Sequence, residues 1–205
     1  MNDPQQNKYV MLAITICFTT PLVFQTLSVL IYPPDFSGEY PVYPPDGILM
    51  LQFAGASTLL GLTILGMKAE EEKQILAAAG FTAQAISLGL AAASLFEITM
   101  VTSRESYEKF YYLTVSSNFL FIPSLLLIAT YNKFKKWVKL SGLIASLPLL
   151  VSSLMFIFRY RDYKVLEEIS NTGYLMVFVV YLLWCLNVYQ NYRKDLKKTH
   201  GGSTL

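Results

Sequence analysis

Residues 47–67 read GILMLQFAGASTLLGLTILGM, an unbroken apolar run of 21 residues without a charged side chain. An α-helix rises 1.5 Å per residue, so a run of this length crosses the hydrocarbon core of a bilayer, which is about 30 Å thick. A backbone in lipid must satisfy its hydrogen bonds internally, and the run lacks the alternation of a barrel strand. The stretch therefore predicts a transmembrane helix.

Five further stretches have the same character. Hydrophobic residues make up 54% of the 205-residue chain and charged residues only 15%, against about 25% charged in soluble domains. The six predicted spans cover residues 9–31, 47–67, 74–101, 110–131, 138–158 and 172–188. We expect an all-α polytopic membrane protein in which residues 1–205 form one domain, a six-transmembrane-helix bundle, and residues 189–205 form a basic cytosolic tail.

Lysine and arginine are distributed unequally over the connections between these spans. One side of the membrane receives eleven of them: Lys8, Lys68, Lys73, Lys133, Lys135, Lys136, Lys139, Arg193, Lys194, Lys197 and Lys198. The other side receives five: Arg104, Lys109, Arg159, Arg161 and Lys164. Because basic residues accumulate on the cytosolic side, the count predicts that both chain ends are cytosolic (N-in/C-in).

Small residues recur at four-residue intervals on two adjacent faces of the third predicted helix. The two sets are Ala85, Gly89 and Ala93, and Ala83, Ser87 and Ala91. Small residues at this spacing let helix backbones approach closely in lipid. The pattern favours packing within the bundle over a seam for dimerisation.

The first outer loop repeats the sequence Tyr-Pro-Pro-Asp, at residues 32–35 and 43–46. Tandem prolines hold a backbone near polyproline II, and Asp46 stands where an N-cap of the second helix is expected. The loop is either a stiff cap on the bundle or a recognition element. In the second case its candidate binding residues are Asp35, Glu39, Tyr43, Pro44, Pro45 and Asp46.

Glu97 is the single acidic residue inside the predicted spans. An ionisable group in the membrane is costly, and it is a functional hypothesis by default, although this one is close enough to the interface to reach water or an arginine of an outer loop. Gln25, Gln52 and Asn118 also fall in the outer or middle part of their spans. Together these four side chains predict a shallow polar cavity that opens to the outer side.

The cytosolic basic residues form two clusters. Lys133, Lys135, Lys136 and Lys139 make up the first cluster, and Arg193, Lys194, Lys197 and Lys198 the second. They are either the topology signal alone or a contact for anionic phospholipid, such as phosphatidylserine or a phosphoinositide.

Several classes of function have no support in the sequence. Cys17 and Cys185 lie in apolar stretches, and the only histidine, His200, lies in the tail, so neither a disulfide framework nor a histidine-based site inside the membrane is available. The sequence has no pairing of a nucleophile with a base and no phosphate-binding glycine loop. We expect no catalysis, no cofactor, no metal site and no nucleic-acid binding.

The run from Glu39 to Asp46, Glu-Tyr-Pro-Val-Tyr-Pro-Pro-Asp, resembles the acidic-Thr-Gly-Thr-x-Pro-Pro-Glu signature of the damage-regulated autophagy modulator family. Residues 94–97, Ser-Leu-Phe-Glu, resemble that family's Asn-Phe-Gln element, with Glu97 at the Gln position. The aromatic, polar stretch 181–192 resembles the end of its last helix. The family also includes the suppressor-of-four-kinase and post-GPI-attachment relatives, and it is described as six-spanning.

The resemblance implies a non-enzymatic membrane regulator of the lysosome, another endomembrane or the plasma membrane. Such a protein acts on autophagy, lipid distribution or recruitment of a phosphoinositide kinase, with membrane lipids and a cytosolic protein as partners. The alternative is a small transporter module with an outward-facing pocket, since substrate-binding subunits of vitamin uptake systems also have six helices. A regulator predicts a bundle that is packed shut, and a transporter predicts an enclosed outer pocket with convergent polar groups.

Overall fold

A computed structural model describes the backbone of residues 4–38, 41–98, 104–160 and 162–200, and the side chains of residues 8–38, 41–95, 105–160 and 162–194. Within these residues the chain forms six helices: α1 (Pro4–Ile31), α2 (Pro45–Glu71), α3 (Ile75–Ile98), α4 (Arg104–Ile128), α5 (Lys136–Ile157) and α6 (Tyr163–His200). All six are long and apolar enough to cross a membrane. The predicted all-α, six-helix membrane protein is confirmed.

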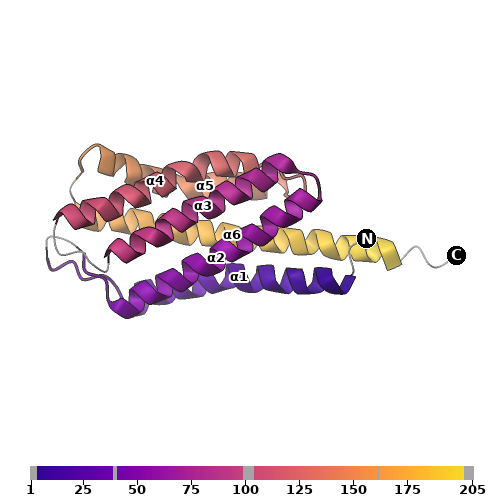
Figure 1. Cartoon of the computed structure of the whole chain (residues 1–205), viewed down its shortest axis with the longest axis horizontal. Coiled ribbons are helices and arrows are strands. Elements are labelled where there is room, and N and C mark those ends of the chain that lie inside the picture. The colour runs from indigo at the N-terminus through magenta and orange to yellow at the C-terminus, as the bar shows by residue number, and fades with distance from the viewer. Residues whose placement is uncertain (1–3, 39–40, 99–103, 161, 201–205) are drawn as a thin grey trace.

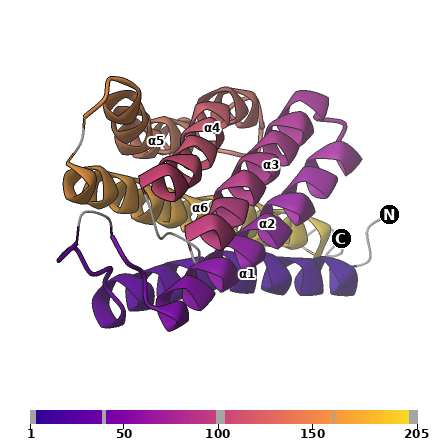
Figure 2. The same cartoon turned by 60° about the vertical axis from the view of Figure 1, so that its left-hand side comes forward.

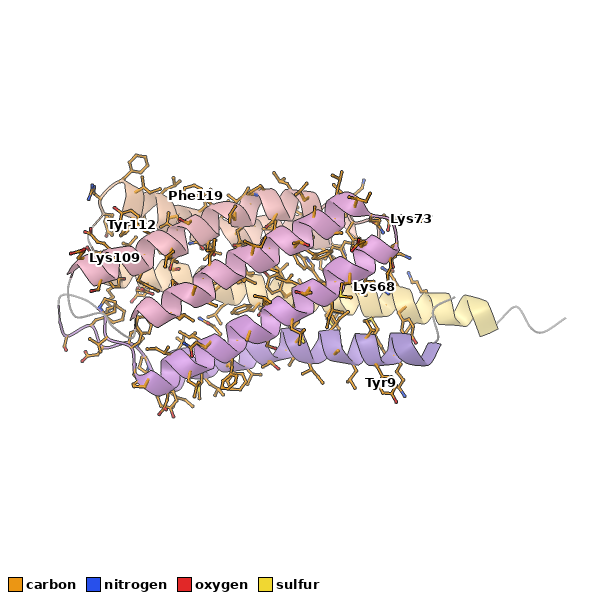
Figure 3. All side chains as sticks on the ribbon, viewed as in Figure 1. Tyr9, Lys68, Lys73, Lys109, Tyr112 and Phe119 are labelled. Atoms are coloured by element: carbon orange, nitrogen blue, oxygen red, sulfur yellow. The ribbon has the colours of Figure 1, made fainter. Side chains whose placement is uncertain are left out.

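The helices form a ring (Figures 1 and 2). Each helix packs against the next one along the chain, and α6 returns to pack against α1. The start of α1 and the end of α6 lie at the same end of the bundle, and α6 extends beyond the other helices there (Figure 1). Lys68 and Lys73 lie at this end and Lys109 at the opposite one (Figure 3). Both termini at one end is what the N-in/C-in prediction requires, and following that prediction we call this end the cytosolic end and the opposite one the outer end.

The last helix is much longer than the sequence analysis predicts. α6 begins at Tyr163 rather than at residue 172, and it continues through most of the predicted tail to His200. The prediction from hydropathy was wrong here because charged residues at both ends of the helix dilute the apolar signal. As a consequence, Glu167 lies inside α6 and not in a loop.

The small-residue pattern of α3 packs within the bundle in part: Ser87 is buried, whereas Ala93 is exposed. Ser87 Oγ donates to the Ser117 carbonyl of α4 at 2.7 Å, and Ser117 Oγ donates to the Ser87 carbonyl at 2.6 Å. On the other face, a Cβ added to Gly55 of α2 would lie 3.3 Å from Ala92 Cβ. The two faces therefore hold α3 between α2 and α4.

A polar connection also crosses the centre of the ring. Gln84 of α3 donates from Nε2 to the Tyr181 hydroxyl of α6 at 2.8 Å, and Ser124 of α4 donates to Gln84 Oε1. Below it, toward the cytosolic end, Phe81, Phe134 and Trp184 pack with ring centroids 5.4 to 6.1 Å apart. This half of the bundle is closed by large aromatic side chains.

The outer loop folds back on itself. The backbone amide of Asp35 donates to the Val42 carbonyl at 2.8 Å, and the Val42 amide donates to the Asp35 carbonyl at 2.9 Å. The prediction that Asp46 caps α2 is wrong: the N-cap is Pro44, without a side-chain hydrogen bond, and Asp46 lies exposed in the first turn. Pro45 occupies the first helical position. Proline is favoured there because a backbone amide at that position would have no acceptor within the helix.

Candidate functional site

The outer half of the ring contains a partly open cavity of about 80 Å³. Since a water molecule needs roughly 10–15 Å³ on this measure, the cavity holds several waters or a small chemical group. Apolar atoms make up most of its surface, and polar residues of α1, α3, α4, α6 and the outer loop also line it. The polar members are Gln25, Tyr43, Ser94, Tyr111, Thr114, Glu167, Ser170, Asn171 and Tyr174.

Glu167 of α6 is the acidic residue of this cavity, and only 4% of its surface is exposed. The Tyr107 hydroxyl of α4 donates to Glu167 Oε1 at 3.0 Å, and the Tyr43 hydroxyl forms a second hydrogen bond to the carboxyl. Two hydroxyl donors on one carboxyl suit its ionised form, which only accepts hydrogen bonds. Tyrosine hydroxyls therefore hold the carboxyl in place in the cavity wall.

Tyr43 reaches the cavity from the outer loop, directly before Pro44 begins the turn into α2. Burial and the neighbouring Glu167 carboxyl raise the pKa of the Tyr43 hydroxyl well above its usual value. The hydroxyl therefore stays protonated and remains a donor at ordinary pH. Through this residue the outer loop takes part in the site.

Tyr111 provides a buried hydroxyl that has no hydrogen-bond partner among the described residues. The residue is 2% exposed, and its ring stacks on Phe156 with centroids 4.5 Å apart. A buried polar atom without a partner is costly, and each one calls for an explanation. Because Tyr111 lines the cavity, a molecule inside the cavity can supply the missing partner.

Tyr174 is held in the wall by an amide behind it. Its hydroxyl donates to Asn118 Oδ1 at 3.1 Å, and Asn118 Nδ2 donates to Ser153 Oγ at 3.0 Å. Asn118 is buried but is not part of the cavity wall. It positions Tyr174 and ties α4 and α5 to α6.

The structure brings together part of the predicted outer site. Gln25 and Tyr43 line the cavity, and Asn118 lies behind the wall, whereas Gln52 is half-exposed and outside it. The loop prolines Pro44 and Pro45 only begin α2. Asp35 is exposed and accepts the Ser37 amide at 2.8 Å, which lowers the pKa of its carboxyl. Glu39 and the side chain of Glu97 lie outside the described residues.

Glu167 was missed from the sequence because the predicted last span begins only at residue 172. A signal was present, since Tyr163, Leu166, Ser170 and Tyr174 follow one another at helical spacing on the inner face of α6. Three of these are buried and Tyr174 lines the cavity. Glu167, one residue beyond Leu166, falls on the same face. Extending the helical pattern upstream of the apolar run finds the residue.

The cytosolic basic residues lie where the α4–α5 connection docks on α6. Lys135 donates from Nζ to Gln190 Oε1 at 3.2 Å, and Asn191 Nδ2 donates to the Lys133 carbonyl at 2.6 Å. The Arg193 guanidinium lies 5.9 Å from the centre of the Tyr189 ring. Both clusters thus meet at one end of the bundle, with Lys136, Arg193 and Lys194 exposed and Lys139 half-exposed. The side chains of Lys197 and Lys198 lie outside the described residues.

The described side chains contain no group of three histidine, cysteine, aspartate or glutamate residues able to hold a metal ion. Comparison with known proteins found no matching family model, no matching curated protein and no matching solved structure. The resemblance to the damage-regulated autophagy modulator family therefore remains a prediction. The chain is a six-helix, multi-pass membrane protein with a largely apolar cavity, one end of whose wall carries a buried carboxyl.

Proposed function

We propose that this protein binds a small amphiphilic molecule, whose polar end occupies the outer cavity. The observation that carries the proposal is the convergence of a buried carboxyl and an unpartnered buried hydroxyl, Glu167 and Tyr111, on one space. A bundle with only a structural role gains nothing from burying a carboxyl beside a cavity or from leaving the Tyr111 hydroxyl without a partner. The geometry fits the alternative prediction, a pocket with convergent polar groups, better than a bundle that is packed shut.

The size and lining of the cavity indicate what part of a ligand it holds. Sites for whole drug-sized ligands measure about 300–1,000 Å³, whereas this cavity measures about 80 Å³. Leu51 and Gly55 of α2 and Leu95 of α3 form part of the wall and are themselves half-exposed. A polar head fits inside, and an apolar tail can leave between these two helices into the surrounding lipid.

A cavity-filling substitution tests this function. Ala91 lines the cavity, so Ala91→Leu places three additional carbon atoms in it, whereas Ala93, on the same helix, is exposed. Native mass spectrometry of the protein purified in mild detergent would show which membrane molecules it retains. We expect Ala91→Leu to lose the retained molecule and Ala93→Leu to keep it. Equal retention by both variants, with both folded, would refute the proposal.

Transport and regulation both begin with binding, and an uptake assay distinguishes them. If the protein is a carrier, vesicles that contain it accumulate the bound molecule, and Ala91→Leu abolishes the accumulation. Under the regulator hypothesis, the same molecule binds without crossing the membrane. The compartment and the link to autophagy depend on the resemblance alone.

We propose in addition that the cytosolic end contacts anionic phospholipid. The supporting observation is that docking of the α4–α5 connection on α6 brings Lys136 and Lys139 to the same end as Arg193 and Lys194. Each such residue contributes about 1 kcal/mol at an anionic leaflet. Replacing these four residues by Gln should reduce retention of phosphatidylserine relative to phosphatidylcholine in mixed micelles. Unchanged selectivity would refute this contact.

A further inference from the structure

We infer that the molecule bound in the outer cavity carries a cationic amine, which pairs with Glu167. This inference rests on the proposed function and names the chemistry of its ligand. It starts from the charge of the wall: among the described residues, those that line the cavity include Glu167 but no lysine, arginine or histidine. The protein therefore presents a carboxyl to the cavity without a basic residue beside it in that wall.

The hydrogen bonds of Glu167 leave room for such a partner. An ionised carboxyl has about four acceptor positions, and Tyr107 and Tyr43 occupy two of them. A carboxylate inside a membrane protein is stabilised when a cation pairs with it, because the low dielectric strengthens their attraction. An ammonium group satisfies the carboxylate, whereas a carboxylate or phosphate on the ligand would meet a like charge.

The aromatic residues of the wall favour the same ligand class. Tyr43, Phe110, Tyr111, Tyr174 and Phe178 surround the cavity. Ring faces attract cations, and sites built from several aromatic residues and a carboxylate are suited to ammonium groups. The buried Tyr111 hydroxyl, which has no partner among the described side chains, can accept a hydrogen bond from a primary ammonium or donate one to a neighbouring hydroxyl of the ligand.

Amine and alcohol probes with identical tails test the inference. Radiolabelled hexadecylamine and hexadecanol would be bound to the full-length protein in dodecyl maltoside, with N-hexadecylacetamide as a neutral nitrogen analogue. We expect the amine to bind at least tenfold more tightly than either neutral compound. Ethanolamine, in a parallel arm, shows whether a free amine suffices or a membrane-borne tail is needed. A preference for hexadecylamine over both neutral compounds supports the inference, and binding of ethanolamine would show that the tail is not needed.

Paired variants locate the preference at Glu167. Glu167→Gln removes the charge with little change in shape, and Glu168→Gln makes the same change at the next residue, which is exposed. We expect Glu167→Gln to weaken amine binding at least tenfold without affecting hexadecanol, and Glu168→Gln to leave both unchanged. If Glu167→Gln does not fold, the comparison of the charged and neutral probes on the wild-type protein still shows whether the cavity prefers an amine.

The outcomes separate this inference from the proposed function. If hexadecylamine and hexadecanol bind equally, and Ala91→Leu abolishes both, the cavity binds amphiphiles but the amine inference is wrong. If Glu167→Gln folds and keeps the full preference for the amine, the inference is also wrong. If none of the probes binds and Ala91→Leu loses no retained molecule, the proposed function itself fails.

Discussion

Gly80 provides the sharpest test of how the helices pack. It lies on α3 where the end of α4 approaches, and a Cβ added there would meet the Ile128 amide nitrogen at 2.7 Å and Leu127 Cβ at 2.8 Å. Both distances are below those that real Cβ atoms show, and the first involves backbone, which cannot rotate away. Gly80→Ala must therefore push α3 and α4 apart.

The magnitude follows from two opposing effects. Overpacking a well-packed interior costs typically about 1–3 kcal/mol, whereas replacing glycine by alanine inside a helix gains up to about 1 kcal/mol. We expect Gly80→Ala to lower the free energy of unfolding by about 1–2 kcal/mol. Gly89 is a matched control on the same helix, because its added Cβ would meet Leu59 Cδ1 at an ordinary 3.7 Å. Gly89→Ala should be neutral or slightly stabilising.

The assay is reversible unfolding of the purified protein by sodium dodecyl sulfate in mixed micelles. Trp184 reports on the transition through its fluorescence, since it is buried against Phe134 with ring centroids 5.4 Å apart. Both variants gain the same helix propensity, so the difference between their free energies of unfolding equals the steric cost at Gly80, about 1–3 kcal/mol. If Gly80→Ala is as stable as Gly89→Ala, the close approach of α3 and α4 described above is wrong.

Three further predictions concern other parts of the bundle. Ser87→Ala removes the hydrogen bond to the Ser117 carbonyl and should lower the free energy of unfolding by about 0.5–1 kcal/mol in the same assay. The control Ser116→Ala, on the exposed side of α4, should leave the stability unchanged. Equal effects of the two substitutions would contradict the hydrogen bond between α3 and α4. Tyr131 follows α4 at the cytosolic end and donates to Glu72 Oε2 at 3.1 Å, and its burial, followed by the Glu72 carboxyl, raises the pKa of its hydroxyl. Its stabilising contribution is therefore present below the unfolded pKa of about 10 and lost as the pH rises above it. The stability advantage of the wild type over Tyr131→Phe should shrink between about pH 9 and pH 11. A constant difference in stability would contradict the raised pKa of the Tyr131 hydroxyl. Reporter tags at the two chain ends should both be cytosolic, and tags on opposite sides of the membrane would overturn the orientation.

The candidate site was only partly predictable from the sequence. Gln25 and Tyr43 were found because polar residues in or beside an apolar span are rare and conspicuous. Glu167 was missed because its neighbours, Lys164 and Glu168, make that stretch resemble a loop. The importance given to Asp35 and Asp46 came from the repeated Tyr-Pro-Pro-Asp motif, but both residues are exposed and away from the cavity. Repetition in a sequence does not show which side chain turns inward.

By itself the sequence determined that the chain crosses a membrane as six helices, because the free energy of moving a segment into hydrocarbon is a sum over residues that are neighbours in the chain. It also indicated that the face of α3 with Ser87 packs against a neighbour, since small residues at four-residue spacing share a helix face. Only the tertiary structure decided that α6 closes the ring on α1 and that Glu167, Tyr43 and Tyr107 meet beside the cavity. These contacts join residues more than fifty positions apart, and they depend on how each helix is rotated about its axis, which packing against neighbouring helices determines.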